Sequence, residues 1–342
     1  MTNRGLGVPP ERAEAARRRL KESGWLRTDL AVLHEGRTIV FPLTVDARPD
    51  PGDGTVVERE FAALKLPVQT YRELIRGLPV ELAEKLPRSF DVVGDIVLVR
   101  IPEELLAYRD EVGRALLEFV PGARLVGWDQ GVHGVERRRR LVPLAGTGEF
   151  RTRCRENGLT LDVDLDRAYY SPRLSSEHAR VAQEVRAGER VFDLCCGIGP
   201  FALSIARDGR AREVVAVDLN REAISLLRAN ADRLSLSDRV RPVVSDVGEF
   251  LESAGVADRA ILNLPHEGIK YLASVANRVG PAGTLHYYEM MERSVQPERP
   301  QEIVRGLDPH GGWELGPVRV LHPYSPTSDL ISVTFHRRAE AP

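Results

Sequence analysis

A run of apolar residues breaks at two glycines in the segment VFDLCCGIGPFALSIA, which begins at Val191. Gly197 and Gly199 follow an expected strand and precede an expected helix, so backbone amides and the helix N-terminus can approach a ligand closely. Ala202 completes the pattern Gly-x-Gly-x-x-Ala, and Asp218 ends the next strand about 20 residues later. This turn predicts a cofactor site, and by itself it fits a nicotinamide dehydrogenase as well as other classes.

Three further features follow neighbouring strands of the same region. Asp193 lies four residues before the first glycine, Asp246 follows the third strand, and Asn263 to Pro265 (NLP) follows the fourth. Each acid alone is explained by a helix cap or a solvated loop. Open α/β sheets bind ligands at the carboxyl ends of their strands, however, so we expect these groups at one site. A dehydrogenase has no need of the third and fourth loops, which favours S-adenosylmethionine over a dinucleotide.

The elements that must position these residues begin at about residue 166. Strand-like segments alternate with helical stretches there, which predicts a parallel sheet with helices on both faces. Two final strands joined by a short turn add an antiparallel member. We therefore expect a Rossmann-like α/β domain over residues 166–342. Its expected strands are ERVFDLCC, REVVAVDL, VRPVVSD, DRAILNLP, GTLHYYEM, GPVRVLHPYS and SDLISVTFH.

Two smaller regions precede this domain. Residues 1–68 combine an amphipathic helix pattern around Glu11–Glu22 with two strand-like runs, RTIVFPLTV and REFAALKL, and predict a small α/β module. Residues 69–165 contain a helix-like TYRELIRGL, a β-rich RSFDVVGDIVLVRIP and a helical LLAYRDEVGRALLEF. They end in two strands joined at Asn157-Gly158, the strongest short hairpin signal. The middle region is therefore expected to be α+β.

Composition limits the class of protein. At 342 residues and 42% hydrophobic content the chain is long enough for two or three domains. It has neither an 18-residue apolar run nor a signal peptide, so we expect a soluble, cytoplasmic protein. Its three cysteines form neither a disulfide framework nor a zinc site, and no metal is expected. We expect them to be structural.

Charge gives a local signal only. The net charge is −2, so overall charge does not argue for a nucleic-acid partner. Only four of the 48 basic residues are lysine, and the arginine fork suits phosphates and base edges. Arginines cluster at Arg137–Arg140 and again at Arg151, Arg153 and Arg155, just ahead of the glycine segment. Taken alone, these clusters are better interpreted as a solvated face.

The segment LDVDLDRAYYSPRLSSEHARVAQEV, which leads into VFDLCCGIGPFALSIA and later ILNLP, resembles the archaeal and eukaryotic tRNA (guanine-N1)-methyltransferases. The resemblance extends over Ser89–Glu104 (SFDVVGDIVLVRIPEE), Leu144–Gly146 (LAG) and Glu156–Gly158 (ENG). It implies a class I methyltransferase that transfers the methyl group of S-adenosylmethionine to N1 of guanosine 37, the nucleotide directly 3′ of the tRNA anticodon. It also implies that the N-terminal module contacts the outer corner of the tRNA and the other domains the anticodon stem-loop. No obligatory protein partner is expected, and a monomer suffices.

Methylation at guanine N1 makes three demands on the protein. N1 keeps its proton at neutral pH, so the reaction needs a base at N1, donors for the negative charge that develops at O6, and in-line placement of the methyl group. The resemblance implies Glu177, eight residues after Tyr169, as the general base and Arg137 as the O6 donor. Arg139, two residues further along the same expected strand, remains open as the alternative arginine.

The resemblance implies roles for further residues. Tyr169 matches an aromatic beside the target base, Asn263 matches the amide that holds the guanine, and Pro265 makes that loop rigid. At the cofactor it implies Asp193, Cys195, Gly197, Gly199, Asp218, Leu219, Asp246, Val247 and Asn263.

Glu177 also has a purely structural interpretation as a first-turn carboxylate stabilised by the helix dipole, which would lower its pKa. A base needs the opposite, so we expect burial in the complex with RNA to raise that pKa. Arg173, in the matching SPR segment, is expected at a phosphate or at the cofactor carboxylate. We expect Glu267, which follows His266, to cap the next helix rather than to select the substrate.

Several other functions were weighed. A wybutosine-pathway aminocarboxypropyltransferase shares the architecture, but its NLP and SPR segments look different. Additional methylation of the imidazo intermediate of wyosine synthesis stays open. A nicotinamide dehydrogenase would bind NADH instead of S-adenosylmethionine. The presence of Glu177, Asn263 and a suitably placed arginine argues against an RNA-binding protein on a decayed methyltransferase fold.

Overall fold

The computed structural model describes residues 2–63, 68–134, 136–307 and 312–339. The chain forms two compact units, Met1–Thr70 and Tyr71–Pro342. The division predicted from sequence placed boundaries near residues 68 and 165, and the three-domain organisation stays a prediction. None of the helices in the described ranges combines the length and apolar character needed to cross a membrane.

The first unit is an antiparallel sheet with one helix, and the predicted helix is confirmed. The strand order is β2-β3-β1-β4, and α1 buries Ala16 and Leu20 in a core shared with Phe41. The elements are β1 (Thr2–Val8), α1 (Pro10–Glu22), β2 (Leu33–Glu35), β3 (Thr38–Pro42) and β4 (Thr55–Glu60).

Three strands of this unit differ from the sequence prediction: β1 and the three-residue β2 were not predicted, and β4 was predicted too far along the chain. β1, at the centre of the sheet, was not predicted because its sequence TNRGLGV is rich in glycine, which weakens a strand pattern. Gly5 is needed there because a β-carbon would meet Phe61 and Val40. The strand predicted over REFAALKL is wrong in position: β4 ends at Glu60, and residues 64–67 lie outside the described residues.

The second unit starts with a four-stranded sheet of order β5-β6-β7-β8, which carries a hydrophobic core against α3. The predicted helix over TYRELIRGL is only a single 3-10 turn, because Gly77 at φ 76° and Pro79 follow directly. The elements are η1 (Tyr71–Leu74), α2 (Val80–Ala83), β5 (Asp91–Val93), β6 (Ile96–Val99), η2 (Glu103–Tyr108), α3 (Arg109–Phe119), β7 (Leu125–His133) and β8 (Arg138–Gly146).

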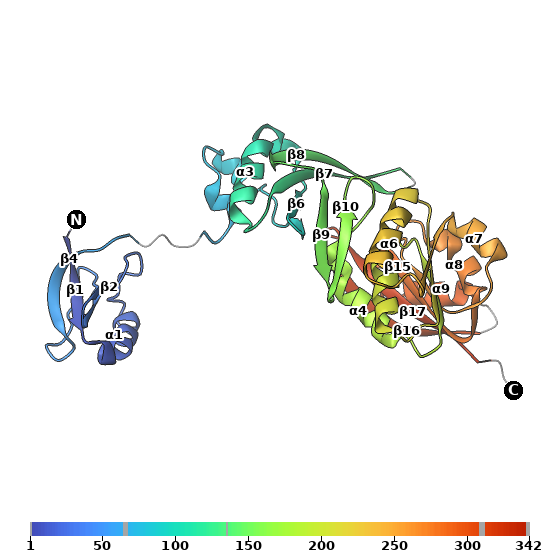
Figure 1. Cartoon of the computed structure of the whole chain (residues 1–342). Coiled ribbons are helices and arrows are strands. Elements are labelled where there is room, and N and C mark those ends of the chain that lie inside the picture. The colour runs from blue at the N-terminus through green and yellow to red at the C-terminus, as the bar shows by residue number, and fades with distance from the viewer. Residues whose placement is uncertain (1, 64–67, 135, 308–311, 340–342) are drawn as a thin grey trace. The chain divides into compact units, whose positions relative to one another are not determined.

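The predicted hairpin at Asn157-Gly158 is confirmed. Both residues have positive φ, 48° and 76°, as a two-residue hairpin turn requires. The turn joins β9 (Arg151–Glu156) to β10 (Leu159–Asp164), and the pair packs against α6 (Arg221–Arg233), as Figure 1 shows. Asn230 of α6 exchanges two hydrogen bonds with the backbone of Asp162, at 2.7 and 3.0 Å.

A seven-stranded sheet forms the rest of the unit in the order β13-β12-β11-β14-β15-β17-β16. Figure 1 labels its strands β15, β16 and β17. The first five strands are parallel, and β17 runs antiparallel to both of its neighbours. This confirms the predicted α/β class with its antiparallel addition. The strands are β11 (Arg190–Leu194), β12 (Glu213–Asp218), β13 (Val240–Val244), β14 (Ala257–Leu262), β15 (Val279–Glu292), β16 (Trp313–Pro323) and β17 (Ser328–Arg337).

Helices cover both faces of this sheet and create two cores. In β11, Val191 joins the core beneath α4, α5 and α6, whereas the next residue, Phe192, joins the core beneath α7, α8 and α9. A strand buried on both faces is apolar throughout, which explains the continuous hydrophobic runs in the sequence. The helices besides α6 are α4 (Ser175–Glu184, after η3, Pro172–Leu174), α5 (Pro200–Asp208), α7 (Val247–Ser253), α8 (Ile269–Ala276) and α9 (Arg299–Leu307).

Candidate active site

The glycine segment forms a tight turn between β11 and α5. Cys195, Gly197 and Gly199 all have positive φ, at 63°, 55° and 80°. A β-carbon at Gly199 would overlap Leu227, so no larger residue fits without movement. Cys195 is held in a conformation that non-glycine residues rarely adopt, and such strain is concentrated at functional sites. The turn lies at the carboxyl edge of the sheet, where its own hydrogen bonds, such as that from the Gly199 amide to the Cys196 carbonyl at 2.9 Å, hold it in shape.

Two carboxylates flank this turn. Asp218, at the end of β12, accepts hydrogen bonds from the amides of Gly197 (2.7 Å) and Asn220 (2.8 Å). Asp193 is fully buried and accepts from the Ala202 amide at 3.0 Å through Oδ2, whereas its Oδ1 has no partner among the described residues. Burial raises the pKa of both acids, and that of Asp193 reaches about 7.

Asp246 caps the helix that follows the third strand. Its Oδ1 accepts the Gly248 amide and its Oδ2 accepts the Tyr271 hydroxyl, each at 2.7 Å. Burial opposes the charge of Asp246, but these hydrogen bonds outweigh it and hold its pKa below the ordinary value. Val247 is buried at the start of α7, whereas Leu219, beyond β12, is 42% exposed.

Tyr169 connects the upstream regions to the glycine turn. The carbonyl oxygen of Tyr169 lies beside Gly197: a β-carbon added to Gly197 would be 3.3 Å from this oxygen. The guanidinium carbons of Arg139 and Arg137 lie 4.9 and 5.7 Å from the centre of its ring. The arginine cluster and the cofactor turn, distant in sequence, are therefore neighbours.

The two arginines have different surroundings. Arg139 is buried on β8, where it pairs with Asp129 and donates to the Tyr170 carbonyl at 3.2 Å. Arg137 lies one residue before β8, at φ 53°, rather than on the strand as predicted. Its guanidinium forms no ion pair or hydrogen bond within the described part of the chain. Arg137 is therefore the arginine available to a ligand.

Glu177 lies in the first turn of α4 and is only 3% exposed. Its Oε1 accepts from the hydroxyls of Tyr288 (2.8 Å) and Ser332 (3.0 Å). Arg180 contacts both carboxylate oxygens, at 2.6 and 2.7 Å. Burial works against the charge, but the hydrogen bonds from Arg180 and Tyr288 outweigh it and lower the pKa of Glu177. The expected rise of that pKa concerns the RNA complex and stays a prediction.

The NLP loop lies at the same edge of the sheet as Glu177. Leu262, just before Asn263, pairs with Tyr287, just before the Tyr288 that binds Glu177. The carbonyl of Pro265 accepts the Met290 amide at 3.0 Å, which fixes the loop on β15. Asn263 itself is half-buried.

One expectation for a neighbouring charge needs correction. Glu267 does not cap α8: it is exposed and pairs with Lys270 at 2.5 Å, and Gly268 is the N-cap residue. Arg173 pairs with Asp91 of β5 at 2.7 Å, and its expected place at a phosphate or the cofactor carboxylate stays a prediction.

Some contacting residues were missed by sequence reasoning. Arg180 was detectable, because a position three residues after Glu177 lies on the same helix face. Tyr288, Ser332 and Asp129 carry no motif and approach the site only through strand pairing.

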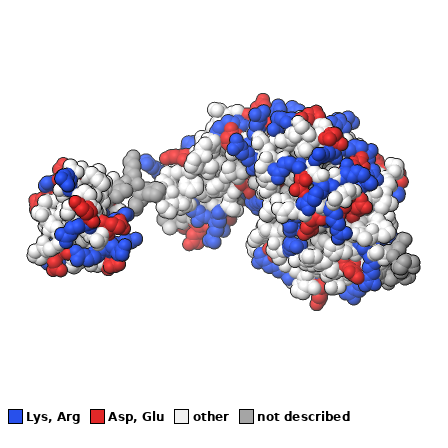
Figure 2. Space-filling model, turned by 60° about the horizontal axis from the view of Figure 1, so that its bottom comes forward, with Lys and Arg blue, Asp and Glu red and all other residues white. Residues whose placement is uncertain are grey.

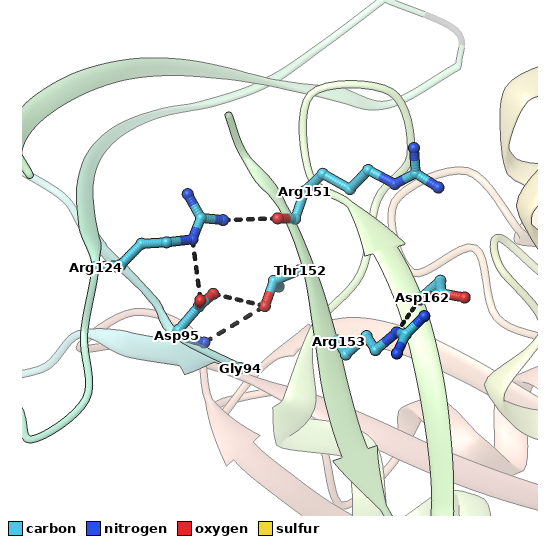
Figure 3. Close-up of a pocket in the computed structure, with 7 residues that line it drawn as sticks. All are labelled: Gly94, Asp95, Arg124, Arg151, Thr152, Arg153 and Asp162. Carbon is cyan, nitrogen blue, oxygen red and sulfur yellow. Dashed lines mark hydrogen bonds and ion pairs between the residues drawn. The ribbon is translucent and has the colours of Figure 1, made fainter. Parts of the chain in front are cut away.

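A hollow of about 630 Å³ lies away from the cofactor residues, at the β5–β6 turn and the β9–β10 hairpin (Figure 3). Arg124 forms an ion pair there with Asp95 at 2.9 Å, and Arg153 forms one with Asp162 at 2.8 Å. Figure 3 shows the guanidinium of Arg151 pointing away from Arg124. Figure 2 shows basic and acidic side chains intermingled on one face of the second unit.

Comparison with known proteins settles the family. Residues 152–310 match the TRM5/TYW2 methyltransferase domain, and residues 71–150 match the TYW2 N-terminal domain. The chain is 34% identical to tRNA (guanine(37)-N(1))-methyltransferase Trm5b of Pyrococcus abyssi over 92% of this chain and 88% of that relative. This chain belongs to the tRNA (guanine(37)-N(1))-methyltransferase family. The resemblance inferred from the YYSPRLSSE and NLP segments is confirmed.

Solved structures of this methyltransferase family agree with the fold. The crystal structure of Pyrococcus abyssi Trm5b matches with a TM-score of 0.84 at 32% identity, covering 98% of this chain and 99% of that chain. A complex of aTrm5 and tRNALeu matches with a TM-score of 0.79 at 27% identity and the same coverage. A shorter relative, tRNA 4-demethylwyosine(37)-methyltransferase Taw21 of Saccharolobus solfataricus, is 29% identical over 65% of this chain and 90% of its own length.

Proposed function

We propose that this chain transfers the methyl group of S-adenosylmethionine to N1 of guanosine 37 in tRNA. The observation that carries the proposal is the meeting of Arg137 and Tyr169 beside the Gly197 turn, which joins a guanine-binding group to a cofactor site. Membership of the family supports the same reaction, and the relative solved with tRNALeu supports tRNA as substrate.

The residues at the carboxyl edge of the sheet fit S-adenosylmethionine. The unpartnered Oδ1 of Asp193 offers an acceptor to an ammonium group, and the acceptor lone pairs left on Asp218 suit ribose hydroxyls. We propose that Gly197, Gly199, Cys195, Leu219, Asp246, Val247 and Asn263 complete the cofactor site. When bound, the cofactor supplies a methyl group on a positively charged sulfur, which is a good leaving group.

The chain's own residues then act on the guanine. We propose that Arg137 donates to O6, where negative charge develops, because its guanidinium is not committed to an acid. Asn263 holds the guanine edge, Pro265 keeps that loop in place, and Tyr169 packs against the base.

Glu177 is proposed to take the proton from N1. Its lowered pKa keeps the carboxylate ionised at neutral pH and therefore able to accept a proton. The four hydrogen bonds that lower the pKa also weaken the base. A productive complex must therefore loosen at least one of the contacts from Arg180, Tyr288 or Ser332.

The upstream regions are proposed to hold the tRNA, residues 1–68 at the outer corner and residues 69–165 at the anticodon stem-loop. The TYW2 N-terminal domain match over residues 71–150 supports a shared role of the middle region among tRNA-modifying relatives.

A methyl-transfer assay with methyl-labelled S-adenosylmethionine tests the proposal. The substrates are an unmodified tRNA with guanosine 3′ of the anticodon and its adenosine variant. We expect 1-methylguanosine from the first and no product from the second. Label incorporated only when the aminocarboxypropyl carbons are labelled would instead establish the wybutosine-pathway transferase.

A second activity on the imidazo intermediate of wyosine synthesis is a further candidate. The observation that favours it is the similarity to Taw21, whose name specifies methylation of 4-demethylwyosine. The same assay on tRNA that carries 4-demethylwyosine tests this activity.

A further inference from the structure

Two aromatic rings meet edge to face at the rim of the proposed guanine site. His266 directly follows Pro265, and Tyr324 lies in the turn between β16 and β17. The ring centroids are 5.7 Å apart and the planes meet at 66°. Both residues are exposed, Tyr324 by 45%.

Each ring is carried by a well-braced turn. Around His266, the amides of Glu267 and Gly268 donate to the Leu264 carbonyl at 3.2 and 2.7 Å. Around Tyr324, the hydroxyl of Ser325 accepts the Ser328 amide at 3.0 Å, and the Tyr324 amide donates to the Ser328 carbonyl at 2.9 Å. The backbone that carries each ring is therefore fixed before any ligand binds, which reduces the entropy lost on binding.

The pair borders the residues proposed to act on the guanine. Burial lowers the pKa of His266, and the nearby positive charge of Arg137 lowers it further. Arg137 also lies over the ring of Tyr169. Arg137 therefore acts electrostatically on His266 and also lies over the aromatic ring that is expected beside the target base.

The chemistry of the pair suits an uncharged, flat ligand. With its lowered pKa, His266 is neutral at pH 7 and presents a ring rather than a cation. Single-stranded RNA loops are recognised by splayed bases that stack on aromatic side chains. An enzyme that takes one base out of its stack also leaves the neighbouring bases without a stacking partner.

We propose that His266 and Tyr324 form a stacking platform for the nucleobase adjacent to the target guanosine in the anticodon loop. This inference rests on the proposed function, because it assigns a substrate subsite beside the same catalytic groups. The platform holds the neighbouring base in a fixed place and so sets the position of the target relative to Arg137 and Glu177.

The test uses the full-length protein and tRNA transcripts that carry 2-aminopurine directly 5′ or directly 3′ of the target guanosine. This base emits more strongly when it is unstacked. At one of the two positions, the complexes with Tyr324→Ala and His266→Ala should emit more strongly than the wild-type complex. The KM for tRNA should rise about fivefold or more in these variants, as expected for one base stacked on one aromatic ring.

Tyr324→Phe keeps the ring and should match the wild type in emission and in KM. Val320→Ala removes an exposed apolar side chain from β16, the strand that leads into Tyr324. This variant should also leave the emission and the KM unchanged. Equal melting temperatures and equal S-adenosylmethionine affinity would establish that the alanine variants are folded. If either alanine variant fails to fold, His266→Phe and Tyr324→Phe must retain the wild-type emission.

Failure of the platform can be distinguished from failure of the proposed function. If the wild type methylates these transcripts and the alanine variants emit equally with wild type at both positions, the stacking platform is wrong and the proposed function stands. If the wild type does not methylate guanosine in any transcript, the proposed function fails, and with it the assignment of this subsite.

Discussion

Arg139 and Asp129 form an ion pair in which each side chain is only 5% exposed. The same guanidinium lies 4.9 Å from the centre of the Tyr169 ring and binds the carbonyl of Tyr170. Arg139 therefore has a structural position, whereas Arg137, at 5.7 Å from the same ring, has no acidic partner within the described residues. The sequence alone did not decide which of the two arginines acts on the guanine. Because their surroundings differ, substitutions of Arg137 and Arg139 are expected to have different effects.

Replacing Arg137 should affect the rate. Arg137→Ala should lower single-turnover methyl transfer by about 10²- to 10³-fold, the usual cost of losing one donor to developing negative charge. The melting temperature should stay close to that of the wild type, because the side chain pairs with no acid. A rate within a few fold of wild type, measured by rapid quench with saturating tRNA, would remove Arg137 from this role.

Replacing Arg139 should affect stability. Arg139→Met leaves Asp129 buried without its partner, which costs roughly 3–5 kcal/mol of unfolding free energy. Denaturant unfolding measures this loss. Asp129→Asn together with Arg139→Met should recover part of it, because the stranded charge is gone. If the single variant is as stable as wild type, the Arg139–Asp129 ion pair does not stabilise the fold.

Glu177→Gln should lower the single-turnover rate by about 10²- to 10⁴-fold, the range for loss of a general base. Glu184→Gln is the matched control: it removes the other carboxylate that binds Arg180, at 2.5 Å, on the exposed side of the same helix. Its rate should be nearly unchanged. Equal rates in both variants would mean that Glu177 is not the general base and only stabilises the local structure.

The pH dependence follows from the lowered pKa of Glu177. A carboxylate with a folded-state pKa below its unfolded value of 4.5 contributes stability above that value, which is lost as pH falls through the folded pKa. Tyr288→Phe removes one of the bonds that lower the pKa, so the acidic limb of the rate profile should move to higher pH. An unmoved limb in a pH–rate profile would mean that another group sets it.

The raised pKa of Asp193 predicts a pH dependence of stability opposite to that of Glu177. Its pKa of about 7 in the folded chain lies above the ordinary 3.8, so its contribution to stability is full below pH 3.8 and is lost as pH rises through 7. Without cofactor, the wild type should lose melting temperature over that interval relative to Asp193→Asn. Binding of a cation at Asp193 favours the ionised form, so cofactor titrations near pH 6.5 should release protons in the wild type and none in the variant. Calorimetry in buffers of different ionisation enthalpy detects this.

The glycine turn predicts a steric effect. Gly199→Ala adds a β-carbon that overlaps Leu227 at a positive φ, so both a clash and an unfavourable backbone act on it. Gly188→Ala is the control, because its φ of 81° is similar but no atom lies within 4 Å of the added carbon. The control should lose about 1–2 kcal/mol, and Gly199→Ala should lose clearly more. Equal losses in denaturant unfolding would show that Leu227 moves aside at no cost.

Local patterns in the sequence predicted much of the fold. Asn157-Gly158 predicted the hairpin because its turn needs two residues that accept positive φ, and the apolar runs predicted the strands of the large sheet. The strand at Thr2–Val8 was missed because Gly5 is required by the packing of Phe61 against it, which no local pattern reveals.

The candidate site was predictable only in part. Asp193, Asp218 and Asp246 follow from their places at strand ends. The partners of Glu177 do not, because Tyr288 and Ser332 lie 111 and 155 residues away and reach it through strand pairing. The difference between Arg137 and Arg139 likewise depends on Asp129, which lies on the neighbouring strand.

The tip of the β7–β8 hairpin delivers Arg137 to a turn that belongs to a much later part of the chain. Neither segment holds the whole of the proposed reaction centre: under the proposed function, one carries the acceptors for a cofactor and the other carries the donor for the base. Separating the two segments is therefore expected to leave neither part able to transfer a methyl group.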